Sequence, residues 1–262
     1  MRGKQRYIMT IGAAALLLVL SASVIHAGHA WSTYHWERSS NPLQLVLGDN
    51  VSGTWDARLL EARDDWNVSA VLDISIGTGS AKPRNCRPGN GEAEICNASY
   101  GFNGWLGIAQ IWIDGDHITK GSVKVNDTYH DSPPYNTYEW RQSVMCQEIG
   151  HIFGLGHQDE NFNTVGTSCM DYSNPPASSP NQHDYDQLAD IYGHLDSDGG
   201  GKGGGPPPGK GKPSTPPGLE QGDLNDPSQW GHLIASSRDG RRAVFLRDIG
   251  GDQKLVTFVI WA

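Results

Sequence analysis

The stretch that decides the fold runs from Gln147 to His157 and reads QEIGHIFGLGH. Residues four apart share one face of a helix, so Gln147 and His151 are expected to project together. A glycine at position 154 can leave the helix with a positive φ and turn the chain back sharply. His157 would then approach the same point from another direction. Three such ligands, with a fourth position open, are typical of a catalytic zinc ion.

Glu148 lies at the edge of the same helical face, between the two positions that project together. A carboxylate beside a metal-bound water can act as a general base, because the metal lowers the pKa of that water towards about 7. The spacing therefore predicts one ion and one base at the end of a single helix.

A second motif follows closely and reads Cys169-Met170-Asp171-Tyr172. The two motifs together resemble the metzincin clan of zinc metallopeptidases, in which His-Glu-x-x-His-x-x-Gly-x-x-His precedes a methionine turn. Within that clan, the small size of the chain is similar to that of matrixins and snapalysin-like bacterial enzymes. The resemblance covers residues from about 34 to 195.

The resemblance implies that the chain hydrolyses peptide or protein substrates. It makes His151 and His157 zinc ligands and Glu148 the general base. Met170 would form a hydrophobic floor beneath the metal. Tyr172 lies two residues later, where astacins and serralysins carry a tyrosine that ligates zinc or stabilises the tetrahedral intermediate. It is therefore predicted to stabilise an oxyanion, with a purely structural role as the even alternative.

The sequence departs from the family at Gln147, where metzincins have histidine. An amide oxygen is neutral and harder than imidazole, whereas zinc prefers nitrogen and sulfur among neutral ligands. We expect weaker zinc binding, with Gln147 as a tolerated third ligand because the rest of the motif is intact. The alternative is a catalytically impaired pseudopeptidase that acts as a protein-binding module.

Four cysteines follow the basic, apolar N-terminus, and an even number in an exported chain predicts disulfides. They can pair in three ways: Cys86, Cys96, Cys146 and Cys169. A bond between Cys86 and Cys96 would close a short loop. A bond between Cys146 and Cys169 would join the active-site helix to the methionine turn that the resemblance implies. We expect these two bonds.

The first 30 residues have the order of a secretory signal peptide: basic residues, an apolar run over Ile8–Leu20, then small residues. Polar and small residues interrupt the run, which argues against a membrane anchor. This segment carries three basic residues, so its removal changes the net charge of the chain from −9 to −12. A protein with this negative charge repels the phosphates of nucleic acid. We expect a secreted monomer without nucleic-acid or membrane partners.

Hydrophobic periodicity predicts an α+β fold for the metzincin-like domain, residues 31–197, with a mixed twisted sheet. The expected strands are Gln44–Leu47, Val71–Ile76, Trp105–Ile113 and Ile118–Val125. The expected helices are residues 54–67, capped by Thr54, an active-site helix from the capping pair Asn136 and Glu139 to about Phe153, and a C-terminal helix at Asn181–Leu195. Pro83–Asn97 is expected to be a loop.

Three remaining segments have less specific patterns. The acidic stretch Asp159-Glu160-Asn161 is a candidate structural calcium site, although a solvated loop is favoured. Residues 198–218 are rich in glycine and proline and predict a linker, or a stalk if the chain were a surface-attached structural protein. Residues 219–262 predict a small β-hairpin with strands at Ala243–Leu246 and Val256–Trp261. A lone hairpin is marginally stable, so we expect it to dock on the main domain or on a partner.

Overall fold

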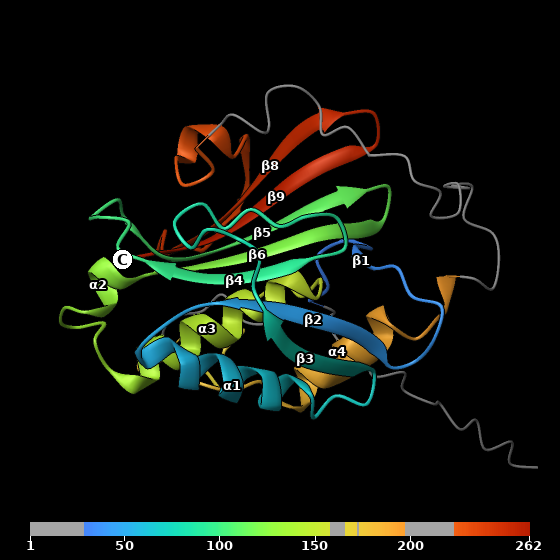
Figure 1. Cartoon of the computed structure of the whole chain (residues 1–262), viewed down its shortest axis with the longest axis horizontal. Helices are drawn as coiled ribbons and strands as arrows, with labels where there is room; N and C mark the ends of the chain where they lie inside the picture. Colours follow the sequence, from blue (N-terminus) through green and yellow to red (C-terminus); the bar gives the residue numbers. More distant parts are fainter. Residues whose placement is uncertain (1–28, 158–165, 172, 197–222) are drawn as a thin grey trace, which may run out of the picture.

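The computed structural model describes residues 29–157, 166–171, 173–196 and 223–262. These residues form an α+β fold in which one mixed, twisted sheet lies over a layer of helices (Figure 1). The sheet runs in the order β3-β2-β4-β6-β5-β9-β8-β7, and β1 pairs with β6 outside this path. None of the helices in the described ranges is long and apolar enough to cross a membrane.

The first part of the sheet is parallel, apart from one strand. Strands β2, β3, β4 and β6 pair in parallel, β1 pairs in parallel with β6, and β5 runs antiparallel beside β6. Parallel neighbours need a crossover connection, which is usually a helix, and α1 supplies it between β2 and β3. The bounds are β1 His35–Trp36, β2 Leu43–Asn50, α1 Thr54–Trp66, β3 Leu72–Thr78, β4 Ala93–Ala98, β5 Trp105–Asp114 and β6 His117–Asn126.

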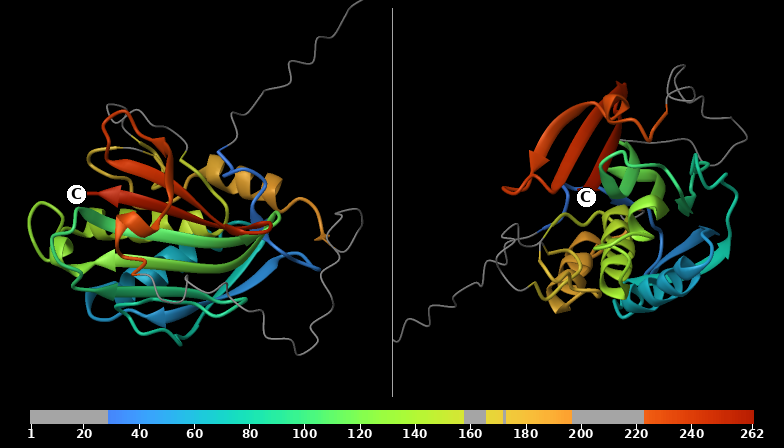
Figure 2. Two further views of the ribbon diagram at one scale, coloured as in Figure 1. Left: turned by 90° about the horizontal axis from the view of Figure 1, so that it is seen from above. Right: turned by 90° about the vertical axis from the view of Figure 1, so that its left-hand side faces the viewer.

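The helices cover one face of the sheet, as the end-on view in Figure 2 shows. They are α1, the short α2 (Asp127–His130), α3 (Tyr138–Ile152) and α4 (Gln182–Ile191). Helix α3 is central, with every residue from Gln142 to Ile152 buried. The fully buried Trp66 at the end of α1 donates its indole N–H to the carbonyl of Cys146 at 3.1 Å. The core therefore holds α3 firmly against the sheet.

Several local predictions need correction. The expected loop at Pro83–Asn97 contains β4, which pairs with β2 on one side and β6 on the other. The N-cap of α1 is Gly53 rather than Thr54, and no side chain caps it. Thr137, one residue after the expected Asn136, caps α3 by accepting from the backbone N–H of Trp140. Helix α4 ends at Ile191, before the expected Leu195.

The C-terminal segment extends the same sheet. After the short 3-10 helix Pro227–Gln229, it forms β7 (His232–Ser236), β8 (Arg242–Gly250) and β9 (Gln253–Trp261). Strand β9 pairs antiparallel with β5 along its whole length, from Trp105 opposite Trp261 to Asp114 opposite Gln253. The predicted hairpin thus docks on the main domain, with β7 as an additional strand (Figure 2).

Both expected disulfides form, Cys86–Cys96 and Cys146–Cys169, and none of the described cysteines is free. The first fastens the loop before β4 to β4 itself, and the second joins α3 to the segment before α4. Disulfides persist in oxidising compartments, so both bonds are consistent with secretion.

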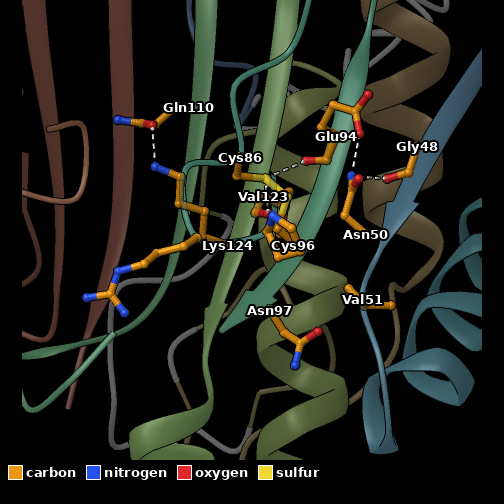
Figure 3. The surroundings of a disulfide bond; sticks show 12 residues. Gly48, Asn50, Val51, Cys86, Glu94, Cys96, Asn97, Gln110, Val123 and Lys124 are labelled. Carbon is orange, nitrogen blue, oxygen red and sulfur yellow. Dashed lines mark hydrogen bonds between the residues drawn. A yellow bond between two sulfur atoms is a disulfide. The ribbon is translucent and has the colours of Figure 1, made fainter. Parts of the chain in front are cut away.

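Lys124 on β6 is a fully buried amine at the place where the C-terminal segment meets the domain. It donates to Asn225 Oδ1 at 3.0 Å. Its Nζ also lies 3.4 Å from Gln110 Oε1, a contact drawn in Figure 3. Burial lowers the pKa of Lys124 to about 7, and the positive charge of Arg87 acts in the same direction, while Asp223 opposes it. The folded state therefore holds this proton less tightly than the unfolded state, whose lysine has the ordinary pKa of about 10.5.

Replacing Lys124 with methionine should stabilise the protein at pH 7, because a buried charge is exchanged for a packed apolar side chain. The buried lysine lowers the free energy of unfolding by up to about 5 kcal/mol for a shift of this size. This destabilisation is complete below pH 7 and disappears as the pH rises towards the pKa of the unfolded lysine. Thermal unfolding at pH 7 and pH 9 should show a smaller pH dependence in Lys124→Met than in the natural chain. Exposed Lys82→Met is the control, and an equal pH dependence in Lys124→Met would contradict the prediction.

Candidate active site

The end of α3 places the three motif side chains that precede its turn. Gln147, Glu148 and His151 are each at most 1% exposed. After Ile152 the chain reverses at Gly154, whose φ is +94°, as the sequence predicted. A Cβ there would lie 2.3 Å from the carbonyl oxygen of Tyr34, so no other residue fits this turn without movement.

The reversal brings His157 back to His151, with the two rings 4.7 Å apart and perpendicular. The Nδ1 of His151 donates to the carbonyl of Leu155 at 2.8 Å, which leaves Nε2 with its lone pair when the ring is neutral. That Nε2 is buried and has no hydrogen-bond partner among the described residues. This is the usual way in which a protein orients a metal-binding histidine.

Desolvation favours the neutral form of both rings. It lowers the pKa of His151 to about 3, and Arg242 and His29 add to that shift. Burial lowers the pKa of His157 well below its ordinary value, again with help from neighbouring positive groups. Neutral imidazole is the form that binds a metal.

Glu148 points towards β5. A Cβ added to Gly107 of β5 would lie 2.9 Å from Oε1 of Glu148, so the glycine makes room for the carboxyl group. Burial raises the pKa of Glu148 well above its usual range, while Arg242 and the backbone N–H of Ala109 oppose the shift. A raised pKa brings a carboxylate closer to the range in which it can exchange protons near neutral pH.

The segment carrying Met170 packs directly under α3. A Cβ on Gly150 would lie 2.6 Å from the sulfur of Met170, so a small residue in α3 permits this approach. The backbone N–H of Met170 donates to Ser168 Oγ at 3.0 Å, and that hydroxyl donates to Asp184 Oδ2 at 2.5 Å. The Cys146–Cys169 bond adds a covalent link between the same two elements. Tyr172 and the candidate calcium stretch Asp159-Glu160-Asn161 lie outside the described residues.

Arg242, at the start of β8, is a site residue that the sequence analysis missed. Its side chain is 2% exposed, and its Nε donates to Gln147 Oε1 at 3.3 Å. It lies 95 positions further along the chain, so no local spacing could have connected it with the motif. The sequence did offer one signal: Arg242 directly precedes the apolar run Ala243–Leu246. Buried strands are normally apolar throughout, so a charged residue at the start of such a run is unusual.

The C-terminal hairpin also covers the histidines. Phe258 on β9 stacks on the ring of His151 with centroids 4.2 Å apart and planes 9° from parallel. A cavity of about 180 Å³ remains beside this contact, lined by His157, Arg242, Trp31 and the nearby strand β8. Strands β8 and β9 therefore cover the motif side chains on the side that faces the sheet.

His29 lies in this cavity and was also missed, because the sequence prediction assigned it to the signal peptide. Its backbone N–H donates to Gln187 Oε1 at 2.8 Å, and its ring Nε2 lies 3.1 Å from Asp184 Oδ1. The boundary of the predicted signal peptide at residue 30 stays a prediction.

The metal that the resemblance implies can be compared with these donors. His151 and His157 fit zinc, because both rings are neutral and converge, and Nε2 of His151 is held ready by Leu155. Gln147 offers only its amide oxygen, which accepts the hydrogen bond from Arg242 in this conformation. Two of the three expected ligands thus suit zinc as they stand, and the third is engaged by the hairpin.

Comparison with known proteins finds similarity only at the level of solved structures. No protein-family model and no curated protein sequence matches the chain. The chain is similar to myroilysin with a TM-score of 0.35 and 12% identity, over 63% of this chain and 98% of that one. It is similar to high choriolytic enzyme 1, a hatching enzyme zinc-protease from medaka, Oryzias latipes, with a TM-score of 0.35 and 14% identity, over 62% and 96% of the two chains.

Proposed function

We propose that the chain is a secreted zinc-dependent metalloendopeptidase whose own C-terminal hairpin closes its active site. The observation that carries this proposal is the convergence of the buried His151 and the partly buried His157 beside a buried glutamate at one helix end. Burial disfavours the charged form of Glu148 and raises its pKa. Such shifts are common in catalytic residues, which supports the role of Glu148 as a general base.

In this proposal Gln147, His151 and His157 hold the ion. When bound, zinc supplies a Lewis acid that polarises a peptide carbonyl and acidifies water. Glu148 takes the proton from the attacking water and passes it to the leaving amine. Tyr172 is proposed to stabilise the oxyanion, and Met170 supports the site from below.

The hairpin is proposed to occupy the place of an extended substrate. A peptide can bind a protein by adding a strand to an exposed sheet edge. The edge of β5 that borders Glu148 would offer such a place, and β9 already pairs with all of it. Arg242 also donates a hydrogen bond to Gln147, so its side chain competes with a metal for the amide oxygen. In this proposal the hairpin therefore blocks the binding of both substrate and metal.

The second candidate function is a pseudopeptidase that binds other proteins. The buried guanidinium of Arg242 favours it, because a fixed positive charge at Gln147 disfavours a divalent cation. The two candidates differ in one measurable quantity, the zinc held by the motif histidines once the guanidinium is removed.

That quantity is the zinc content of the purified mature protein, measured by elemental mass spectrometry after dialysis against metal-free buffer. In the peptidase proposal, Arg242→Ala gains about one zinc per chain over the double variant Arg242→Ala/His151→Ala. Equal zinc in the two variants would favour the pseudopeptidase. Arg241→Ala, at a more exposed neighbouring position, is the control for a general effect of charge.

Replacing Gln147 with histidine should raise zinc affinity by roughly tenfold or more in the Arg242→Ala background, because a third imidazole replaces a neutral oxygen. Chelator competition measures the affinity, and hydrolysis of a fluorogenic peptide mixture gives the activity. A peptidase already hydrolyses peptides with Gln147 in place. Activity that appears only with the histidine would identify the natural chain as a pseudopeptidase.

A further inference from the structure

A second group of histidines gathers around the carboxylate of Asp196, separate from the motif histidines. It consists of His35 on β1, His117 at the start of β6, His194 and Asp196 after α4. The Nε2 atoms of the three rings lie 3.0, 3.3 and 3.4 Å from Asp196 Oδ1. The Nε2 atoms of His35 and His194 lie 3.3 Å from each other.

These spacings are compatible with ligands of a zinc ion. Zinc binds histidine and carboxylate ligands at about 2.0–2.1 Å, so the ligand atoms of a tetrahedral site are about 3.3 Å apart. The rings are also nearly perpendicular, at 82° between His35 and His117 and 79° between His35 and His194. The convergence of the ligand atoms is shown by their distances, since those of His35, His117 and Asp196 all lie within 4.8 Å of one another.

The surrounding contacts hold the ligands in this arrangement. The Nδ1 of His35 lies 2.7 Å from the carbonyl of Thr33 and must donate to it, which leaves Nε2 with a lone pair in the neutral ring. The second oxygen of Asp196 accepts from the backbone N–H of Arg38 at 2.6 Å. The guanidinium of Arg38 donates to the carbonyl of His194 at 2.8 Å.

Hydrogen bonds alone satisfy this cluster poorly. A neutral His35 presents a lone pair both to the carboxylate oxygen and to Nε2 of His194, so an additional proton is needed on the cluster for either contact to attract. A divalent cation between His35, His117 and Asp196 satisfies their ligand atoms without added protons, because these atoms lie within 4.8 Å of one another. The metal-free description of the same contacts is a doubly protonated His35 that donates to Asp196 Oδ1.

We propose that His35, His117 and Asp196 bind a structural zinc ion that is distinct from the ion of the motif, and that the half-exposed His194 turns in as the fourth ligand. Four protein ligands close the tetrahedron, so the site leaves no position for a substrate. The ion would fasten three segments that are distant in sequence: the entry to the sheet, the turn between β5 and β6, and the end of α4. It would complete the folded domain where α4 gives way to the residues that precede the C-terminal hairpin.

The test uses the full chain, stripped of metal with a chelator and titrated with Co²⁺ and Zn²⁺ at pH 7.5. The natural protein should take up one more ion than His194→Gln or Asp196→Asn, and the tetrahedral Co²⁺ absorption of that ion should be missing in both variants. Saturating zinc should raise the Tm of the natural chain by roughly 5 °C and should leave that of His194→Gln almost unchanged.

Two controls separate this ion from other sources. His232→Gln replaces an exposed histidine on β7 and should keep the ion and the zinc-dependent rise in Tm. His151→Gln alters the motif site and should keep the tetrahedral band. The proposal is overturned if His194→Gln and Asp196→Asn bind as much metal as the natural chain, or if all bound metal is lost with His151→Gln. Because His194 is largely exposed, its replacement leaves the fold intact, which circular dichroism verifies.

Discussion

Replacing Glu148 with alanine should reduce peptide hydrolysis by roughly 10²–10⁴-fold while the zinc content stays unchanged, which is the size of effect expected for a lost general base. The carboxyl group is buried against Gly107 of β5, beside the histidines and outside the proposed ligand set. The loss should therefore appear in kcat and not in metal binding. The variant is best made in Arg242→Ala protein with the hairpin released, so that a starting rate exists.

Glu139→Ala is the matched control, since Glu139 is an exposed glutamate in the first turn of the same helix. It should keep the rate of the parent protein. Equal hydrolysis by the Glu148 and Glu139 variants would show that another group removes the proton, and the proposed mechanism would be wrong.

Releasing the C-terminal hairpin should raise peptide hydrolysis by at least about tenfold. As long as the chain is continuous, the hairpin faces β5 at an effective concentration in the millimolar range. A specific protease site inserted within residues 198–218 makes the hairpin a separate fragment without changing its contacts. The rate should then rise on dilution, as the fragment dissociates, and fall again when the purified fragment is added back.

The contacts of the hairpin explain why cleavage alone is not expected to suffice. Val256, Phe258 and Ile260 are at most 1% exposed and belong to the main core, so the fragment should stay bound at high concentration. An insertion of the same length that the protease cannot cut is the control. If the intact and the cut, diluted chains hydrolyse peptides equally fast, the hairpin does not close the site.

The motif helix and the strands around it could be predicted because their signals are local. Strands β5 and β6 have apolar, β-branched runs separated by Asp114-Gly115, and α3 has its ligands at helical spacing. Strand β4 was missed because its sequence, AEICNA, follows a stretch rich in glycine and asparagine. It becomes a strand because β2 and β6 lie on both sides of it, which is a tertiary effect that overrides propensity.

The candidate site was predictable to the same extent. The sequence indicates that Gln147, His151 and His157 belong together, and the structure brings the two histidines within ring contact. Arg242 and Phe258 reach the site only through the pairing of β9 with β5, which joins residues about 150 positions apart. The pattern of apolar residues in one strand indicates which of its faces is buried. It does not indicate which other strand lies beside it, so this pairing could not be predicted from one sequence.

The distant pairing of β5 with β9 also bears on the order in which the molecule assembles. Gln110 and Thr257, bonded across these strands, are separated by 147 positions, whereas β5 and β6 are joined by a tight turn. Contacts of long sequence separation require more chain entropy to be lost before they form, and they slow folding. Strands β1 to β6 and α3 are therefore expected to associate first, with the hairpin joining afterwards. The site would pass through a brief open period during every folding event, in which the metal could enter before Arg242 arrives.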